Sequence, residues 1–303
     1  MKKTNFLLFL LLSLCGVSLL TAQTSEIQIK SDKAFGSEVT IYPKTNSYDT
    51  PIIVDWGDGN TESYNVDPNT SGYFAKVSGS IKGKTIRILS SLTSLEADEL
   101  EITSFVATGQ TELKYLDLSK NKLTKDNFAL NEDAPLENLN LKENDFTTLD
   151  LRSYTSLASI DISGNPRLGT MLVPDGSQTI ERIYANDCDI SHFYPVSLPA
   201  LTTLSLENNS LMDLEIGDNY PKLSSLSISH NEIDVSKLPL LYKLEINYNH
   251  ISRLNLKNNT ELTNLFCSKN KLTNLDLSAN SKLTSIACDS NALTVLDVSM
   301  LTK

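Results

Sequence analysis

The chain has 303 residues, 40% of them hydrophobic and 21% charged, a balance that is typical of globular proteins and excludes an intrinsically disordered chain. Asp and Glu outnumber Lys and Arg by 37 to 26, and the net charge of −11 disfavours a nucleic-acid partner. Three His and four Cys leave little material for a metal centre, so we expect no metal and no other cofactor.

Residues 1–22 have the three parts of a secretory signal peptide. Lys2 and Lys3 precede an uncharged apolar run over 6–20, and Ala22 is a small residue suited to cleavage. The run is shorter than the ~20 residues that span a bilayer, which disfavours a membrane anchor. Leu14 before Cys15 disfavours a lipoprotein. We therefore expect an exported protein, located in the periplasm, at the cell surface or outside the cell, with no membrane span in the mature chain.

Residues 23–91 contain six short runs with the alternation of β-strands. They cover 26–29, 39–42, 52–56, 61–66, 74–77 and 85–89. An Asp-Gly pair within 57–60 predicts a hairpin turn, because both residue types tolerate positive φ. Six strands in about 70 residues predict a small β-sandwich domain over 23–91.

The string Val54-Asp55-Trp56-Gly57-Asp58-Gly59 is similar to the turn of PKD-like, immunoglobulin-like modules. The family's later His-Thr-Tyr stretch is replaced here by Gly72-Tyr73-Phe74. We expect Trp56 in the core. Asp55 and Asp58 suggest either calcium ligands or caps for the amides of the turn, and the second is the more common role. The resemblance implies a module of the kind that precedes adhesive or glycan-binding regions.

From Leu92 onward the chain repeats, with a mean step of about 21 residues. Copies of L-x-x-L-x-L-x-x-N-x-L start at 92, 113, 136, 157, 180, 201, 223, 241, 262 and 283. Most copies also hold a second L-x-x-L-x-L segment, for example Leu272, Leu275 and Leu277. Each repeat therefore predicts two extended segments and two turns, with no room for a helix. The copy at 241 follows the copy at 223 sooner than the mean step, so the second segment over 234–240 must be shortened.

One repeat cannot bury its own leucines, but stacked repeats can, with strands paired laterally at ~4.8 Å. The ninth template position is almost always Asn, whose side chain can bond to backbone groups where the chain turns inward. This column predicts a structural ladder and not a catalytic site; it contains Asn121, Asn144, Asn165, Cys188, Asn209, Asn231, Asn249, Asn270 and Asn291.

This pattern resembles the leucine-rich repeat family, and most of all the internalin-like and BspA-like bacterial surface proteins, which share the 21-residue period and the L-T-x-L-D-L-S half-motif. The resemblance covers 92–303. It implies a mainly β fold: a leucine-rich repeat solenoid of about ten 21-residue repeats, preceded by the small β-sandwich-like domain.

Reactive side chains give no catalytic pattern. Cys267 and Cys288 share an inward template position in consecutive repeats, so they form either a disulfide or a pair of small core residues. The three His are dispersed; His230 and Tyr248 share a rim position in adjacent repeats. No nucleophile elbow, zinc or nucleotide-binding motif occurs. The repeated Asp of L-D-L-S, as in Asp276 and Asp297, belongs to the repeat, so we expect no enzyme.

The outward positions of the first strands form the concave face of such a coil. Large or charged side chains there have no core to enter, which makes them the candidate binding residues. They are Tyr115, Asp117, Asn140, Asp161, Arg182, Tyr184, Glu245 and Phe266.

These observations favour a secreted or cell-surface binding protein that uses its concave face for adhesion-type contact with a protein. One alternative is a glycan-binding accessory module, or an enzyme, of a carbohydrate-active system, suggested by the PKD-like turn. Another is a self-assembling surface component, because no polar segment caps the last repeat and its apolar ring could associate with another copy.

Overall fold

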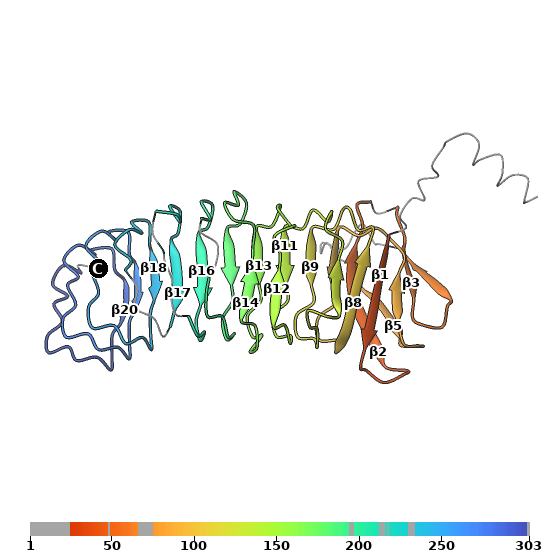
Figure 1. The fold of residues 1–303 in the computed structure, drawn as a ribbon, viewed down its shortest axis with the longest axis horizontal. Coiled ribbons are helices and arrows are strands. Elements are labelled where there is room, and N and C mark those ends of the chain that lie inside the picture. The colour runs from red at the N-terminus through yellow and green to blue at the C-terminus, as the bar shows by residue number, and fades with distance from the viewer. Residues whose placement is uncertain are drawn as a thin grey trace, which may run out of the picture.

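The computed structural model describes residues 25–47, 49–65, 75–193, 197–211, 216, 218–229 and 234–301. The signal peptide expected over 1–22 lies outside these residues. Every regular element in the described ranges is a β-strand. The strands stack into a long body, with the N-terminal strands at one end and the last repeats at the other (Figure 1).

Twenty strands make up the described part of the fold. They are β1 (Glu26–Ser31), β2 (Glu38–Lys44), β3 (Ile52–Asp55), β4 (Thr61–Tyr64), β5 (Val77–Ser80), β6 (Ile86–Ile88), β7 (Ser94–Glu96), β8 (Ile102–Thr108), β9 (Tyr115–Asp117), β10 (Phe128–Leu130), β11 (Asn138–Asn140), β12 (Thr148–Asp150), β13 (Ser159–Asp161), β14 (Thr170–Leu172), β15 (Arg182–Tyr184), β16 (Thr203–Leu206), β17 (Ser225–Ile228), β18 (Lys243–Glu245), β19 (Asn264–Phe266) and β20 (Ser285–Ala287).

The main sheet contains one strand from each of the ten repeats. These strands run parallel in the order β7-β9-β11-β13-β15-β16-β17-β18-β19-β20, and about nine turns of a solenoid join them. The register follows the template, so that Leu95 pairs with Leu116 and Leu265 pairs with Ile286. The expected stack of leucine-bearing rungs is confirmed.

The inward residues of each rung form one continuous apolar interior. Leu116, Ile160, Leu204 and Leu265 are fully buried, and the interior extends from Ile27 to Leu283 as a single cluster. A single rung could not exclude water from its leucines, because its neighbours supply the covering atoms above and below.

The asparagine column is a hydrogen-bond ladder, as expected. Asn144 accepts a bond from the Leu123 amide at 2.9 Å and donates to the carbonyls of Leu118 at 2.9 Å and Leu141 at 3.0 Å. The same pattern recurs at Asn121, Asn165, Asn209, Asn270 and Asn291. Asn231 lies outside the described residues.

Cys188 fills one place in this column, and the local backbone explains why it can. The rung below carries an extra residue at Asn165-Pro166, and the Leu168 amide bonds to the Asn165 carbonyl at 2.9 Å. That amide therefore needs no side-chain acceptor from the next rung. The Cys188 thiol donates weakly to the carbonyls of Ile162 and Asn186, at 3.4 and 3.3 Å.

The residue before each described member of the column takes a left-handed backbone conformation. The φ angles run from 53° to 57° at the non-glycine positions, including Lys120, Glu143 and Tyr248, and φ is 71° at Gly164. The twist lets the amide of this residue bond to the next rung, as the Lys120 amide does to the Lys142 carbonyl at 2.7 Å. The ladder stabilises a conformation that side chains normally avoid.

The six strands expected over 23–91 belong to two layers, with β1, β3, β4 and β6 in one sheet and β2 and β5 in the other, and a separate sandwich-like domain stays a prediction. The hairpin joins β3 to β4, and Asp55 Oδ1 accepts bonds from the amides of Gly57 at 2.8 Å and Gly59 at 3.0 Å. Asp58 caps the Asn60 amide at 3.0 Å, and Trp56 is fully buried. The fifth strand lies at 77–80 and not at the expected 74–77, and residues 66–74 are outside the described ranges.

Both layers continue into the repeats. β2 pairs antiparallel with β7, the first strand of the main sheet, and β1 pairs antiparallel with β8 along its whole length. The expected domain boundary at 91/92 falls between β6 and β7, where the core is continuous. Two domains over 23–91 and 92–303 remain a prediction.

Among the described residues, the second segment of a repeat is a paired strand in the first four repeats and in none of the later ones. It forms β8, β10, β12 and β14 there, and β8 pairs with β10 while β12 pairs with β14. In the shortened rung before β18, too few residues remain for a second strand, which interrupts any such ladder in the C-terminal half. The inward leucines of the later segments, such as Leu272 and Leu277, are still buried.

The described cysteines Cys188, Cys267 and Cys288 are free. Cys267 is fully buried, and burial raises the pKa of its thiol to about 12. The same cause raises the pKa of Cys188 to about 11. Both thiols are therefore protonated and apolar in character at neutral pH, which agrees with core residues rather than reactive ones.

Candidate functional site

The outward side of the main sheet, hereafter the main-sheet face, brings together all eight candidate binding residues. Their side chains are half-buried and form two columns along the rungs. Tyr115 and Arg182 lie in the column that starts each strand. The second column contains Asp117, Asn140, Asp161, Tyr184, Glu245 and Phe266, one on each of six strands.

The aromatic side chains of this face are far apart. Tyr115 on β9 and Tyr184 on β15 are separated by three strand steps, about 14 Å at ~4.8 Å per step. Phe266 on β19 lies four steps beyond Tyr184, about 19 Å. A ligand that contacts all three rings must be of macromolecular size.

The N-terminal end of the face is acidic. Burial, with help from the charges of Asp117 and Asp98, raises the pKa of the Glu96 carboxyl. The Tyr115 hydroxyl is hydrogen-bonded to Glu96, and burial together with the carboxylates raises its pKa to about 12. Asn140 donates to Asp117 at 2.7 Å and orients it. Crowded carboxylates that repel one another favour a cation from a partner.

A hollow of about 400 Å³ opens beside Tyr184. Its lining is polar and consists of Lys142, Glu143, Asp161, Ser163, Gly164, Tyr184, Asn186 and Asp187. Gly164 is the one glycine among the described members of the left-handed column, and a Cβ there would lie 2.9 Å from the Glu143 side chain. The absence of a side chain at Gly164 therefore lets Glu143 pack against the next rung at the border of the hollow.

A floor of small serines separates Tyr184 from Glu245. Ser205, Ser225 and Ser227 are buried, because a short side chain lies flat between its neighbours on the sheet. Ser227 donates to the Glu245 carboxylate at 2.5 Å, and Lys243 lies 3.2 Å from the same oxygen. The floor leaves Glu245 and Tyr184 as the raised features on either side.

Sequence reasoning missed several residues of this face. Glu96 and Asp98 belong to the weakest repeat, whose Leu100 stands in place of Asn, so the template drew no attention to them. Gly164 gave a usable signal, since a lone glycine in a column of larger residues indicates a close approach of a neighbouring side chain, here Glu143. At the rim, Tyr248 is half-exposed and its hydroxyl accepts a bond from Lys269 at 2.6 Å; His230 lies outside the described residues.

Two searches of the described residues give negative results. No group of three or more His, Cys, Asp or Glu side chains among them is arranged to hold a metal ion. No helix in the described part of the chain has the length and apolarity to cross a membrane.

Comparison with known proteins identifies the architecture. No protein-family profile matches the sequence, and no curated protein matches it. Among solved structures, the functional domain of InlJ from Listeria monocytogenes, which includes a cysteine ladder, is similar over 73% of this chain with a TM-score of 0.58 and 22% identity. The fold is a leucine-rich repeat solenoid. The similar region covers 59% of the InlJ chain.

A second solved structure supports the same architecture. A chain of the LRIM1/APL1C complex is similar over 62% of this chain, with a TM-score of 0.51 and 26% identity. The solenoid described here spans 36% of that chain. An internalin from Listeria monocytogenes, InlF, aligns over 69% of this chain at 21% identity, with a TM-score of 0.38.

Proposed function

We propose that this chain is an exported, non-catalytic binding protein that uses its main-sheet face for adhesion-type contact with a partner protein. The observation that supports it most is the set of half-buried large and charged side chains on six of the ten strands of the main sheet. A flat, rigid surface of this kind suits a macromolecule better than a small substrate. The signal-like residues 1–22 support a location at the cell surface, in the periplasm or outside the cell.

The charge of the face indicates the chemistry of the partner. Glu96, Asp98 and Asp117 gather at its N-terminal end, and Asp161 and Glu143 border the hollow beside Tyr184. We propose that the partner presents basic side chains there and inserts one side chain into the hollow. Such a contact forms faster at low ionic strength, because salt screens charges at the rim.

The test uses the whole chain and site-specific photocrosslinking. A benzoylphenylalanine placed at 184 should capture the partner from a cell-surface extract, and the same group at Lys257, which is exposed outside the main sheet, should not. With the captured partner in hand, Tyr115→Ala, Tyr184→Ala and Phe266→Ala should each weaken binding by about tenfold. Equal capture at both positions, or unchanged affinity in all three variants, would reject this face as the binding surface.

The glycan alternative makes a different prediction. The PKD-like turn supports this alternative. A sugar-binding site would use a single aromatic ring, so an oligosaccharide should bind near Tyr184. Its affinity should then not change in Tyr115→Ala or Phe266→Ala. A glycan array probed with the whole chain separates the two ideas.

For self-association, the relevant surface is the last described rung, where Val295 is 74% and Val298 is 45% exposed. Light scattering over a concentration series measures it.

A further inference from the structure

A cavity of about 360 Å³ lies on the back of the solenoid, opposite the main-sheet face, between the second segments of two consecutive repeats. β10 is the last strand of the six-stranded sheet, and β12 is an edge of the two-stranded sheet. In the continuous described range 75–193, β10 pairs only with β8 and β12 pairs only with β14. The back ladder is therefore interrupted between these rungs, although β9 and β11 of the same repeats remain paired.

The repeat length explains the interruption. The repeat that starts at Leu113 runs to the next start at Leu136, which makes it longer than the mean step. The extra residues lie on the back, since the main strands keep their register. The two rungs still meet on either side of the cavity: the Asp145 amide bonds to the Leu123 carbonyl at 2.8 Å, and the Tyr154 hydroxyl donates to the Leu130 carbonyl at 3.0 Å.

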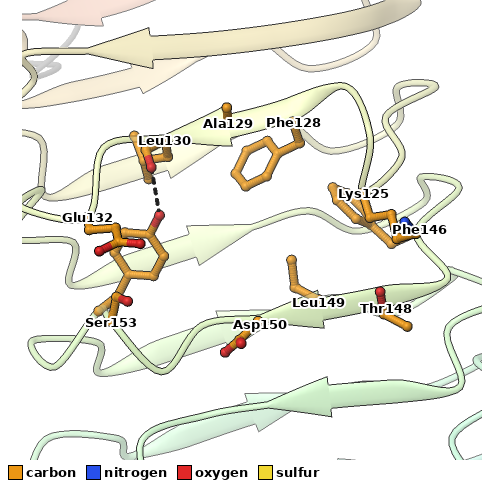
Figure 2. A pocket seen from close by; sticks show the side chains of 11 residues that line it. Lys125, Phe128, Ala129, Leu130, Glu132, Phe146, Thr148, Leu149, Asp150 and Ser153 are labelled. Carbon is orange, nitrogen blue, oxygen red and sulfur yellow. Dashed lines mark hydrogen bonds between the residues drawn. The ribbon is translucent and has the colours of Figure 1, made fainter.

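The floor of the cavity is aromatic. Phe128 is half-buried, and its ring lies 6.0 Å from Phe105 and 5.6 Å from Phe146 between ring centroids. Figure 2 shows this ring pointing from β10 toward the strand that carries Leu149. Leu149 and Tyr154, which are 7% and 8% exposed, complete an apolar lining in which Phe128 is the more exposed side chain.

The walls of the cavity are two strand edges that face each other. The Asn127 carbonyl and the Asn131 amide bond to β8, so the backbone groups of Phe128 and Leu130 point the other way, toward β12. The Thr147 carbonyl accepts a bond from the amide of Gly169, which flanks β14, and the Leu151 amide donates to the carbonyl of Leu172 in β14. By the same alternation, the backbone groups of residues 148 and 150 point toward β10. Apart from the Leu130 carbonyl, which the Tyr154 hydroxyl already contacts, these edges face no strand partner in the described range 75–193. Open strand edges on both sides of an apolar floor are the features that an added strand uses.

The rim sets the charge preference. Lys125 is paired with Asp126 at 2.8 Å, and Asp150 with Arg152 at 2.6 Å. Glu132 lines the other end of the cavity, is exposed, and makes no ion pair with any described residue. A basic side chain that flanks an apolar segment would find its counter-charge there.

We propose that the cavity between β10 and β12 is a docking site for a short extended peptide segment of a partner protein, apolar at its centre and flanked by a basic residue. The peptide bonds to the strand edges, its central apolar side chain rests on Phe128 and Leu149, and its basic residue pairs with Glu132. This site lies on the side opposite the main-sheet face, and it does not depend on the function proposed for that face.

The test measures fluorescence anisotropy of two labelled hexapeptides, each with alternating threonine and valine, a central phenylalanine, and one lysine at the N- or C-terminal end. At least one should bind the whole chain. Thr148→Pro removes an amide that faces the cavity without changing the bonds to β14 and should weaken binding at least tenfold. The matched control is Thr148→Ala, which keeps this amide and only shortens an exposed side chain, so it should bind as the unchanged chain does.

A second pair of measurements does not depend on how the chain tolerates proline. Glu132→Lys, at an exposed position, should weaken the lysine peptide and strengthen one that carries glutamate instead. Peptides with N-methylated backbone amides should lose binding. If neither hexapeptide binds, if Thr148→Pro binds as well as Thr148→Ala while both remain folded, or if the N-methylated peptides bind equally, strand addition at this site is wrong. Retention of binding in Tyr184→Ala would separate this result from any failure of the main-sheet face.

Discussion

Replacement of Asn144 by alanine tests the idea that the asparagine column holds the rungs together. The side chain accepts one bond from the Leu123 amide and shares two carbonyls with its neighbours in the column. Leu118 O also accepts from Asn121, and Leu141 O also accepts from Asn165, both at 3.0 Å. Both carbonyls therefore keep one partner in Asn144→Ala, while the buried amide of Leu123 loses its only side-chain acceptor.

These contacts set the expected loss in the free energy of unfolding. An unsatisfied buried amide costs about 1–3 kcal/mol, and the two lost carbonyl bonds add about 1 kcal/mol in total because each carbonyl keeps a partner. We expect Asn144→Ala to lower the free energy of unfolding by about 3 kcal/mol. Cys188→Ala is the matched control in the same column: it removes only the weak hydrogen bonds of a thiol, so it should cost about 1 kcal/mol.

Urea denaturation followed by circular dichroism gives the two free energies. Hydrogen exchange measured by mass spectrometry adds a local readout, since the Leu123 amide should exchange faster in Asn144→Ala and stay protected in Cys188→Ala. If Asn144→Ala cost no more than Cys188→Ala, or if exchange at Leu123 did not change, the column would fill space without supporting the rungs.

Two further predictions concern the N-terminal third. The pKa of Glu96 is raised in the folded chain, so the folded chain keeps the carboxyl proton to higher pH than the unfolded chain does. The protonated Glu96 therefore stabilises the fold below the usual Glu pKa, and this contribution is lost as the pH rises through the pKa of the folded chain. Glu96→Gln should therefore raise the midpoint of thermal unfolding at pH 7 and leave it unchanged near pH 3, and a gain that persists at pH 3 would contradict the electrostatic cause. A Cβ on Gly83 would lie 1.9 Å from the Gly57 carbonyl oxygen, so Gly83→Ala should cost about 3 kcal/mol in urea denaturation. Gly36→Ala, where no atom lies within 4 Å of the added carbon, should cost about 1 kcal/mol for its positive φ, and equal costs would refute the steric argument.

The repeat made much of the fold predictable from the sequence. Side chains alternate between the two faces of each strand, and the strands recur at intervals of about 21 residues, which fixes the inward positions and the strand pairing. The expected columns on the main sheet, such as Asp117 beside Asn140 and Asn140 beside Asp161, are the observed register partners. The roles of these residues in binding remain predictions.

Other features carried no periodic signal. The pairing of β1 with β8 joins segments far apart in the chain, and nothing in either segment's local pattern specifies the other. The left-handed column includes Lys120, Glu143 and Tyr248, residue types that do not mark positive φ, because the ladder and not the residue imposes the conformation. The cavity at β10 results from extra residues in the repeat that starts at Leu113. In the sequence these residues are visible only as a longer step to the next repeat.

The N-terminal strands solve a problem that every stacked solenoid has at its first rung. An exposed parallel strand such as β7 would offer its backbone groups to any other chain, and its leucines would face water. Here β2 covers that edge in the antiparallel sense, and the short β5 becomes the outer strand. On the back, β1 covers β8 in the same way. Both covering strands run antiparallel to the rungs, so the parallel stack ends at them. The segment before the repeats is therefore best understood as the cap of the solenoid, whether or not it also acts as a module of its own.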